Sequence, residues 1–371
     1  MTQIEVIIFI LLLLMVVPSL CGKIGYTALV YPVYIVAGII FAALVDEDAY
    51  ELLTHVGEFG FIFLLFTIGL EIEFPNKRES LTALRNASLW ILAQVPALTM
   101  VGIMLGFDWS ASLIAATALC ACSVSMTYHV WQKYPHYNDT AKRDILLCMV
   151  ALEILAMIII SSAFAKGGNY GATLLHLLGM VIAIVLVACC AQHLAKGVNR
   201  LLNLTNRWQV HFIALLVLVV AAIGERLGLS APKMAFFFGL FISGATREGL
   251  TMERHLRPIT QQLLIPIFFT GLGIIIPPSV IFSWLGLAGL ALAASLLVCR
   301  YALYKVWWQR WLPGDRWAFL MVCPNLTIVA VAMKALIAMG VDMRLGQTLL
   351  ITGLIMSVVS ILLLPRRTEL T

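Results

Sequence analysis

The chain has 371 residues, of which 62% are hydrophobic and only 12% are charged. Soluble domains contain about 45–50% apolar and about 25% charged residues, so this composition excludes a soluble globular protein and indicates a polytopic membrane protein. The net charge of +5 does not point to a nucleic-acid partner, because the basic residues gather in the connections between apolar runs.

Apolar runs long enough to be membrane spans follow one another along the whole chain. A helix needs about 20 mostly apolar residues to cross a hydrocarbon core of about 30 Å. We therefore expect an all-α protein whose residues 1–371 form a single transmembrane domain, with no cytosolic regulatory domain. The thirteen predicted spans lie near 3–20, 27–45, 57–71, 83–106, 110–130, 144–165, 172–192, 209–227, 230–245, 259–276, 280–304, 317–339 and 345–364.

The first run, 3–20, also has the length of a secretory signal peptide. A signal peptide begins with a basic region, and here Glu5 occupies that place. We therefore interpret 3–20 as the first span.

The distribution of basic residues predicts the orientation. With thirteen spans and the N-terminus outside, eighteen of the 24 Lys and Arg residues fall in inward-facing connections and four in outward-facing ones. Cytoplasmic connections carry an excess of Lys and Arg. The sequence therefore predicts an outer N-terminus and a cytoplasmic C-terminus.

Two spans carry signals of a broken helix. The fifth gathers small and hydroxyl residues at its middle, and the twelfth has Pro324 at a comparable depth. Interruptions at corresponding places in two halves point to a midplane site in an inverted-repeat transporter. Ordinary packing residues and an ordinary proline kink are the alternative. The residues concerned are Cys122, Ser123, Ser125, Thr127, Pro324, Asn325 and Thr327.

Glu153 is the ionisable residue nearest the middle of a predicted span. It stands ten residues after Arg143, about 15 Å along a helix and about half-way through the hydrocarbon core. An ionisable side chain at that depth costs about 2.5–3.5 kcal/mol and usually faces a cavity or a partner. Desolvation disfavours the charged carboxylate, so we expect Glu153 to be protonated without a cation and ionised with one. A neutral, hydrogen-bonded structural glutamic acid is the alternative.

Arg300 lies in the inner third of the eleventh span. Its side chain either snorkels to the cytoplasmic interface or faces the helix bundle. In the second case it would neutralise the negative C-terminal end of a half-helix or pair with an acid.

Motifs for energy-coupling or hydrolytic enzymes are missing from the sequence. It contains no glycine-rich phosphate loop, no GxSxG and no HExxH. Eight cysteines lie within or beside the apolar runs without zinc-ligand spacing to histidines. We therefore expect neither an enzyme nor a cofactor.

Three blocks of the sequence, residues 57–71, 224–244 and 266–276, resemble segments of a known transporter family. This is the monovalent cation:proton antiporter-2 family, which includes potassium-efflux antiporters and bacterial sodium/proton exchangers. Residues 57–71 (GEFGFIFLLFTIGLE) resemble its third-span signature. Residues 224–244 are similar to its eighth-to-ninth-span turn, and 266–276 to its tenth-span phenylalanine–glycine motif. The blocks occur in the family's order, and the resemblance covers essentially the whole chain.

The resemblance implies a sodium/proton antiporter-like fold of inverted repeats with two crossing discontinuous helices. By it, Glu153 occupies the place of the ion-binding aspartate, and Arg300 that of a basic residue that is usually lysine. Leu152 departs from the polar residue that precedes this position in the family, and Asn325 stands where efflux members often carry glutamate. The resemblance also implies a homodimer in the bacterial cytoplasmic (inner) membrane, but not an ion preference.

We therefore expect a secondary antiporter that exchanges Na⁺ or K⁺ for H⁺, with Glu153 binding either the metal ion or the proton. The residues of the two breaks and Arg300 would support it. Residues 83–165 and 280–364 would form a core that moves against a scaffold, the remainder, in elevator-type alternating access. One carboxyl and an arginine that keeps its proton predict electroneutral exchange. A cation channel or membrane sensor, or an organic-anion carrier, remains an alternative, because a fold does not fix function.

Overall fold

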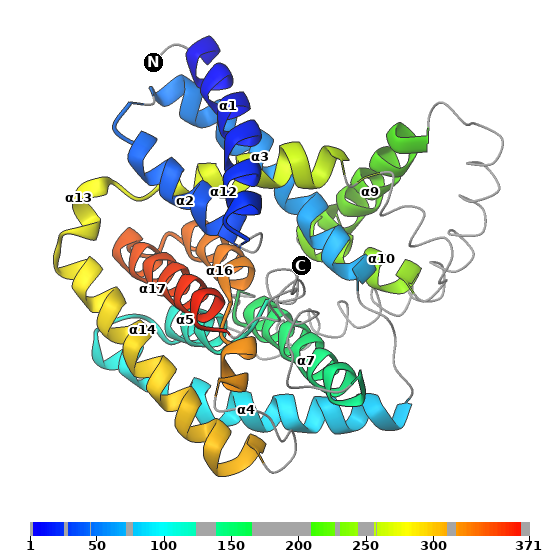
Figure 1. Cartoon of the computed structure of the whole chain (residues 1–371), viewed down its shortest axis with the longest axis vertical. Helices are drawn as coiled ribbons and strands as arrows, with labels where there is room; N and C mark the ends of the chain where they lie inside the picture. The colour runs from blue at the N-terminus through cyan, green and yellow to red at the C-terminus, as the bar shows by residue number, and fades with distance from the viewer. Residues whose placement is uncertain are drawn as a thin grey trace. The chain divides into compact units, whose positions relative to one another are not determined.

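The computed structural model describes residues 3–25, 29–44, 46–71, 77–123, 139–164, 209–226, 231–243, 256, 258–309 and 317–364. Within these ranges the chain is helical and contains no strand, as the sequence predicts (Figure 1). The chain divides into two compact units. Unit 1 comprises Met1–Val16, Leu44–Phe74 and Ala165–Ile274, and unit 2 comprises Val17–Ala43, Pro75–Phe164 and Ile275–Thr371.

Several described helices have the length and composition of membrane spans. Five stretches qualify among the described residues: Glu5–Lys23, Leu81–Met104, Trp284–Trp308, Ala318–Ala338 and Met343–Leu363. Shorter apolar helices lie at Val30–Phe41, Trp109–Cys120 and Gln262–Ile274. The number of thirteen spans stays a prediction, because the expected span at 172–192 lies outside the described residues.

Unit 1 is built around α3 (Glu47–Glu71). It packs against α10 (Ala231–Ser243), α9 (Gln209–Arg226) and α12 (Ile265–Ile274), which follows a π-helical turn, η2 (Thr260–Leu264). The contact between α3 and α10 is close, because a Cβ atom on Gly239 would lie 2.2 Å from the carbonyl oxygen of Phe66. The first residues of α1 (Gln3–Lys23), Val6 and Ile10, belong to an apolar cluster of this unit.

Helix α3 begins ten residues before the predicted start of its span at 57. The additional turns are polar, and Glu51, His55 and Glu58 are exposed. His55 lies 3.9 Å from a carboxylate oxygen of each glutamate. Such pairs at spacings of three and four residues support a helix outside the apolar run. Glu58 therefore lies within the helix and not at its end.

Unit 2 contains the helices that surround the two predicted breaks. They are α4 (Lys77–Met104), α5 (Trp109–Cys120), α7 (Asp139–Phe164), α14 (Trp284–Leu303), α16 (Leu326–Ala338) and α17 (Met343–Leu363), with α2 (Val30–Phe41) against α17. Helix α16 contacts α5, α7 and α17, while α14 runs alongside α17 (Figure 1). The hydroxyl of Thr352 in α17 donates to the carbonyl oxygen of Gly289 in α14 at 3.3 Å. Most side chains of α16 are buried, so it forms the centre of this unit.

Both predicted interruptions lie in unit 2. Helix α5 ends at Cys120, and Ala121 is extended, with φ −69° and ψ 170°. The twelfth span starts as a 3₁₀ helix, η4 (Ala318–Val322), and continues through a non-helical stretch to Asn325 before α16 begins. Ser125 and Thr127 lie outside the described residues.

Candidate ion-binding site

The two interruptions lie against each other. The backbone N–H of Ser123 donates to the carbonyl oxygen of Pro324 at 2.6 Å, and the Thr327 hydroxyl donates to Ser123 Oγ at 2.6 Å. The side-chain amide of Asn325 donates to the carbonyl oxygens of Ala118 and Leu119, at 3.3 and 3.0 Å. A helix that stops inside a membrane leaves backbone groups without helical partners, and here each break supplies partners to the other.

Arg300 of α14 is fully buried and reaches both breaks. One terminal nitrogen, Nη1, donates to the carbonyl oxygens of Val322 and Cys323, at 2.9 and 3.4 Å. The other, Nη2, donates to the carbonyl oxygens of Leu119 and Ala121. The C-terminal ends of helices carry partial negative charge. The guanidinium therefore neutralises two such ends at once and does not snorkel to an interface.

Gln94 of α4 accepts a hydrogen bond from Nε, the remaining nitrogen of the Arg300 side chain. Arg300 Nε donates to Gln94 Oε1 at 3.3 Å, and Gln94 Nε2 donates to the carbonyl oxygen of Trp90 at 3.1 Å. Gln94 is only 2% exposed. Gln94 is not among the residues predicted from the sequence, because no local pattern marks this amide as a partner of Arg300.

Glu153 lies on α7, beside the first break, and is 1% exposed. The Cys122 thiol donates to the carbonyl oxygen of Met149, one helical turn before Glu153, at 3.6 Å. The Glu153 carboxyl is close enough to act electrostatically on that thiol. Helix α7 also contacts α16. The structure thus provides a buried carboxyl group next to the non-helical backbone that follows α5.

One side-chain oxygen atom at the second break has spare accepting capacity. Asn325 Oδ1 is buried and accepts no hydrogen bond from the residues that the structure describes. The Asn325 backbone N–H donates to Ser357 Oγ of α17 at 3.3 Å, which fixes the residue from a third helix. Carboxylate, amide and carbonyl oxygens are the ligands that hard cations prefer. The arrangement is chemically able to bind a small cation or a proton.

The structure therefore brings together most of the residues singled out from the sequence. Cys122, Ser123, Pro324, Asn325, Thr327 and Arg300 meet at the crossing of the two breaks, and α7 carries Glu153 to its side. The roles of these residues stay predictions.

Several proteins named as antiporters or potassium-efflux systems are similar to the chain over most of its length. It is 26% identical over 314 residues to "Probable Na(+)/H(+) antiporter 3" of Methanocaldococcus jannaschii, covering 80% of the chain and 77% of that protein. It is 26% identical over 269 residues to "Na(+)/H(+)-K(+) antiporter GerN" of Bacillus cereus, covering 68% of the chain and 67% of that protein. A glutathione-regulated potassium-efflux protein, KefC of Enterobacter sp. (strain 638), is 27% identical over 280 residues, covering 67% of the chain and 43% of KefC.

The fold matches that of a solved antiporter. The sodium proton antiporter MjNhaP1 from Methanocaldococcus jannaschii superposes with a TM-score of 0.68 at 12% identity, covering 97% of this chain and 95% of that one. This supports the predicted antiporter-like fold with discontinuous helices and a multi-pass membrane protein. The family model described as "Sodium/hydrogen exchanger, transmembrane" matches residues 7–366. The chain therefore belongs to the transmembrane sodium/hydrogen exchanger family.

Proposed function

We propose that the protein is a secondary antiporter that exchanges a monovalent cation, Na⁺ or K⁺, for H⁺. One observation carries the proposal: the fully buried carboxyl of Glu153 lies beside two crossing helix breaks. The printed names of the relatives, which are Na⁺/H⁺ and K⁺ antiporters, support the same class of cargo.

Glu153 is the group that changes partner in this proposal. In its ionised form the carboxylate binds the cation, and Asn325 Oδ1 is an oxygen atom available to help. In its protonated form it is neutral and does not attract a cation. Because a low-dielectric site opposes an uncompensated charge, the empty ionised state is disfavoured and each crossing carries either a cation or a proton.

Arg300 acts as a positioning residue and not as a proton carrier. Its five N–H groups have five acceptors: the Gln94 amide oxygen and the carbonyl oxygens of Val322, Cys323, Leu119 and Ala121. An arginine keeps its proton in proteins, so its charge is constant through the cycle. The same full set of acceptors disfavours an organic-anion carrier, because Arg300 has no N–H group left for a bound anion.

Alternating access is a further part of the proposal. The proposed core, residues 83–165 and 280–364, lies, apart from residue 165, within the compact unit that contains both breaks, Arg300 and Glu153. In the proposal this core moves against the remaining scaffold and exposes Glu153 to either side in turn. The protein works as a homodimer in the bacterial cytoplasmic membrane, with the N-terminus outside and the C-terminus inside.

The test uses proteoliposomes with an imposed pH gradient and a fluorescent reporter of that gradient. We expect addition of Na⁺ or K⁺ to dissipate the gradient with the wild-type protein, and Glu153→Gln to abolish this response. Glu58→Gln is the matched control, since it removes a carboxylate that is exposed and pairs with His55. Retained exchange in a folded Glu153→Gln protein would refute the proposal. Cation flux without proton movement would indicate a channel instead.

A further inference from the structure

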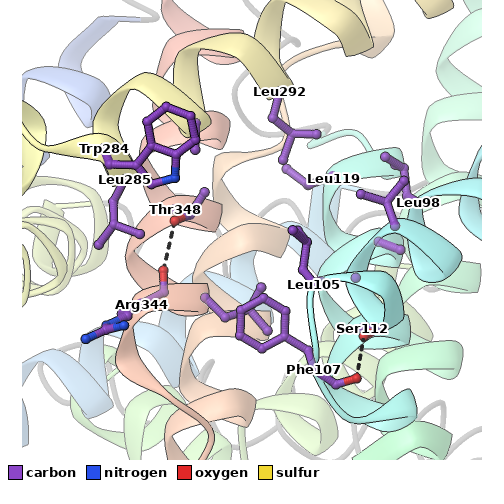
Figure 2. A pocket seen from close by; sticks show the side chains of 16 residues that line it. Leu98, Leu105, Phe107, Ser112, Leu119, Trp284, Leu285, Leu292, Arg344 and Thr348 are labelled. Carbon is purple, nitrogen blue, oxygen red and sulfur yellow. Dashed lines mark hydrogen bonds between the residues drawn. The ribbon is translucent and has the colours of Figure 1, made fainter.

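A cavity lies within unit 2, lined mainly by residues that take no part in the two helix breaks. It has a volume of about 320 Å³ and is enclosed by α4, α5, α14 and α17. Figure 2 shows leucine side chains from these helices pointing into it, among them Leu98, Leu119 and Leu292. The volume is at the lower end of the range of about 300–1,000 Å³ that is typical of ligand pockets.

The hydroxyl groups among the lining residues form hydrogen bonds with backbone carbonyl oxygens of the protein. The Thr348 hydroxyl donates to the carbonyl oxygen of Arg344 at 2.9 Å, and the Ser112 hydroxyl donates to that of Phe107 at 3.5 Å, as the dashed lines in Figure 2 mark. With these two donors in use, the remaining wall is almost entirely hydrocarbon. Such a wall suits an apolar occupant better than water, because a bound water needs two to four polar partners.

Two of the lining residues, Trp284 and Arg344, indicate which class of apolar molecule suits the cavity. Trp284 is 79% exposed, and the Arg344 side chain is 75% exposed. Tryptophan and arginine gather where membrane helices meet the headgroup layer. The Arg344 Nε atom lies 4.0 Å from a carboxylate oxygen of Asp342, an exposed contact that leaves the guanidinium accessible to a second anion. The cavity therefore combines a hydrocarbon interior with a cation.

We propose that this cavity binds an anionic glycerophospholipid of the surrounding bilayer. One acyl chain fills the space between α4, α5, α14 and α17, and the headgroup phosphate pairs with Arg344. Two exposed apolar side chains extend the hydrocarbon surface beside the cavity: Leu105, directly after α4, at 70% and Leu287 of α14 at 60%. A phosphate and a guanidinium form a charge-assisted pair. Zwitterionic lipids carry the same phosphate, but their ammonium group offsets its charge, so an anionic lipid is attracted more strongly to Arg344.

The inner end of the cavity connects it with the candidate ion-binding site. Leu119 lines the cavity, and its backbone carbonyl oxygen accepts hydrogen bonds from Arg300 Nη2 and Asn325 Nδ2. A lipid chain against Leu119 thus contacts the last turn of α5, just before the first break. An influence of this lipid on exchange rests on the proposed function, whereas lipid binding itself does not.

The test is photo-crosslinking of the purified protein in bilayers that contain a lipid with a photoactivatable group in its acyl chain. Peptides covering 284–292 and 345–348 are expected to carry the label. A phosphatidylglycerol probe is expected to label them more than a phosphatidylcholine probe, by up to about fivefold for one arginine near the surface. Absence of label from these peptides, or equal labelling by both probes, would overturn the proposal.

Variants distinguish the cavity from the general lipid-facing surface. Ala288→Phe places a large side chain in the cavity and is expected to reduce labelling of these peptides severalfold. Val298→Phe is the matched control on the same helix, since Val298 is 70% exposed and lies outside the cavity. Arg344→Gln is expected to reduce labelling by phosphatidylglycerol to the level of phosphatidylcholine. Equal labelling of the Ala288→Phe and wild-type proteins would contradict the assignment. So would absence of label in the wild-type cavity together with dissociation of a dimer by Ala288→Phe, because a second copy of the protein would then be the occupant.

Discussion

Arg300 is the residue on which the geometry of the crossing depends most. Its guanidinium connects α14, α4 and the ends of both interrupted helices through five hydrogen bonds. The fork geometry of arginine allows this, while a lysine has a single ammonium group with three donors. The family resemblance predicts a basic residue here, and the structure gives a reason for arginine in particular.

Removal of the guanidinium should therefore lower the stability of the folded protein. Arg300→Met leaves buried carbonyl oxygens without a donor, and each orphaned buried acceptor costs about 1–3 kcal/mol. We expect a large fall in the thermal unfolding temperature in detergent and loss of exchange, with Arg300→Lys intermediate. Arg226→Met, at the exposed end of α9, is the control. If Arg300→Met unfolded at the wild-type temperature, the two helix ends would not depend on this side chain.

Gln94 gives a second test of the same network. Gln94→Leu removes the acceptor of Arg300 Nε and the donor to the Trp90 carbonyl oxygen. We expect destabilisation by about 1–3 kcal/mol, and little additional effect in a protein that already carries Arg300→Met. Fully additive losses in thermal unfolding of the double variant would mean that the two side chains act independently.

At the residue scale the sequence could indicate Glu153 but not its surroundings. A carboxylate in the middle of an apolar run is visible from composition, because its cost in a membrane is large. The partners of Arg300 are mainly backbone carbonyls and an amide from α4, which no local pattern marks. The importance of Gln94 becomes visible only when α4 and α14 are placed together.

At the scale of elements, proline alone does not predict a break. Pro18 and Pro96 lie inside continuous helices, α1 and α4, whereas Pro324 lies in a non-helical stretch. The difference is that the backbone around Pro324 has replacement partners, including Arg300 and Ser123. The two breaks were predictable because small, hydroxyl and proline residues recur at corresponding depths in two spans. The extension of α3 back to Glu47 was not predictable in this way, since hydropathy does not register helix turns supported by contacts between polar side chains, such as those of His55 with Glu51 and Glu58.

The packing of α16 against α17 leaves no room for one extra methyl group. A Cβ atom on Gly353 would lie 2.9 Å from a side-chain carbon of Val329, so something must shift. We expect Gly353→Ala to lower the free energy of unfolding by about 1–3 kcal/mol through overpacking. Gly271→Ala is the control in α12, where the nearest atom would be at 3.9 Å and alanine favours the helix. An equally stable Gly353→Ala protein in thermal unfolding would show that α17 can move aside at this point.

At the scale of the whole molecule, composition and the positions of basic residues carry most of what the sequence establishes. They indicate a polytopic membrane protein, and the described helices agree with that class. Composition and the positions of basic residues do not predict the division into two compact units. It depends on which helices from distant parts of the chain pack together, such as α4 with α7 and α14 with α17.

Charge balance gives a prediction for the intact transporter. One carboxyl that carries either a cation or a proton, together with an arginine of constant charge, moves no net charge per cycle. We expect the exchange rate in proteoliposomes to be unchanged when valinomycin and potassium gradients clamp the membrane potential at different values, with Na⁺ as the transported cation. A rate that rises or falls steeply with potential would show that a second charge moves.

Competition between the cation and the proton for Glu153 is the central claim, and the pH dependence of exchange tests it most directly. Initial rates are measured over a range of Na⁺ or K⁺ concentrations at several pH values on the cation side. Over the range in which Glu153 titrates, the apparent KM for the cation should rise up to about tenfold for each unit that the pH falls, with the maximal rate unchanged. A KM that is independent of pH, with only the maximal rate changing, would contradict a single shared carboxyl.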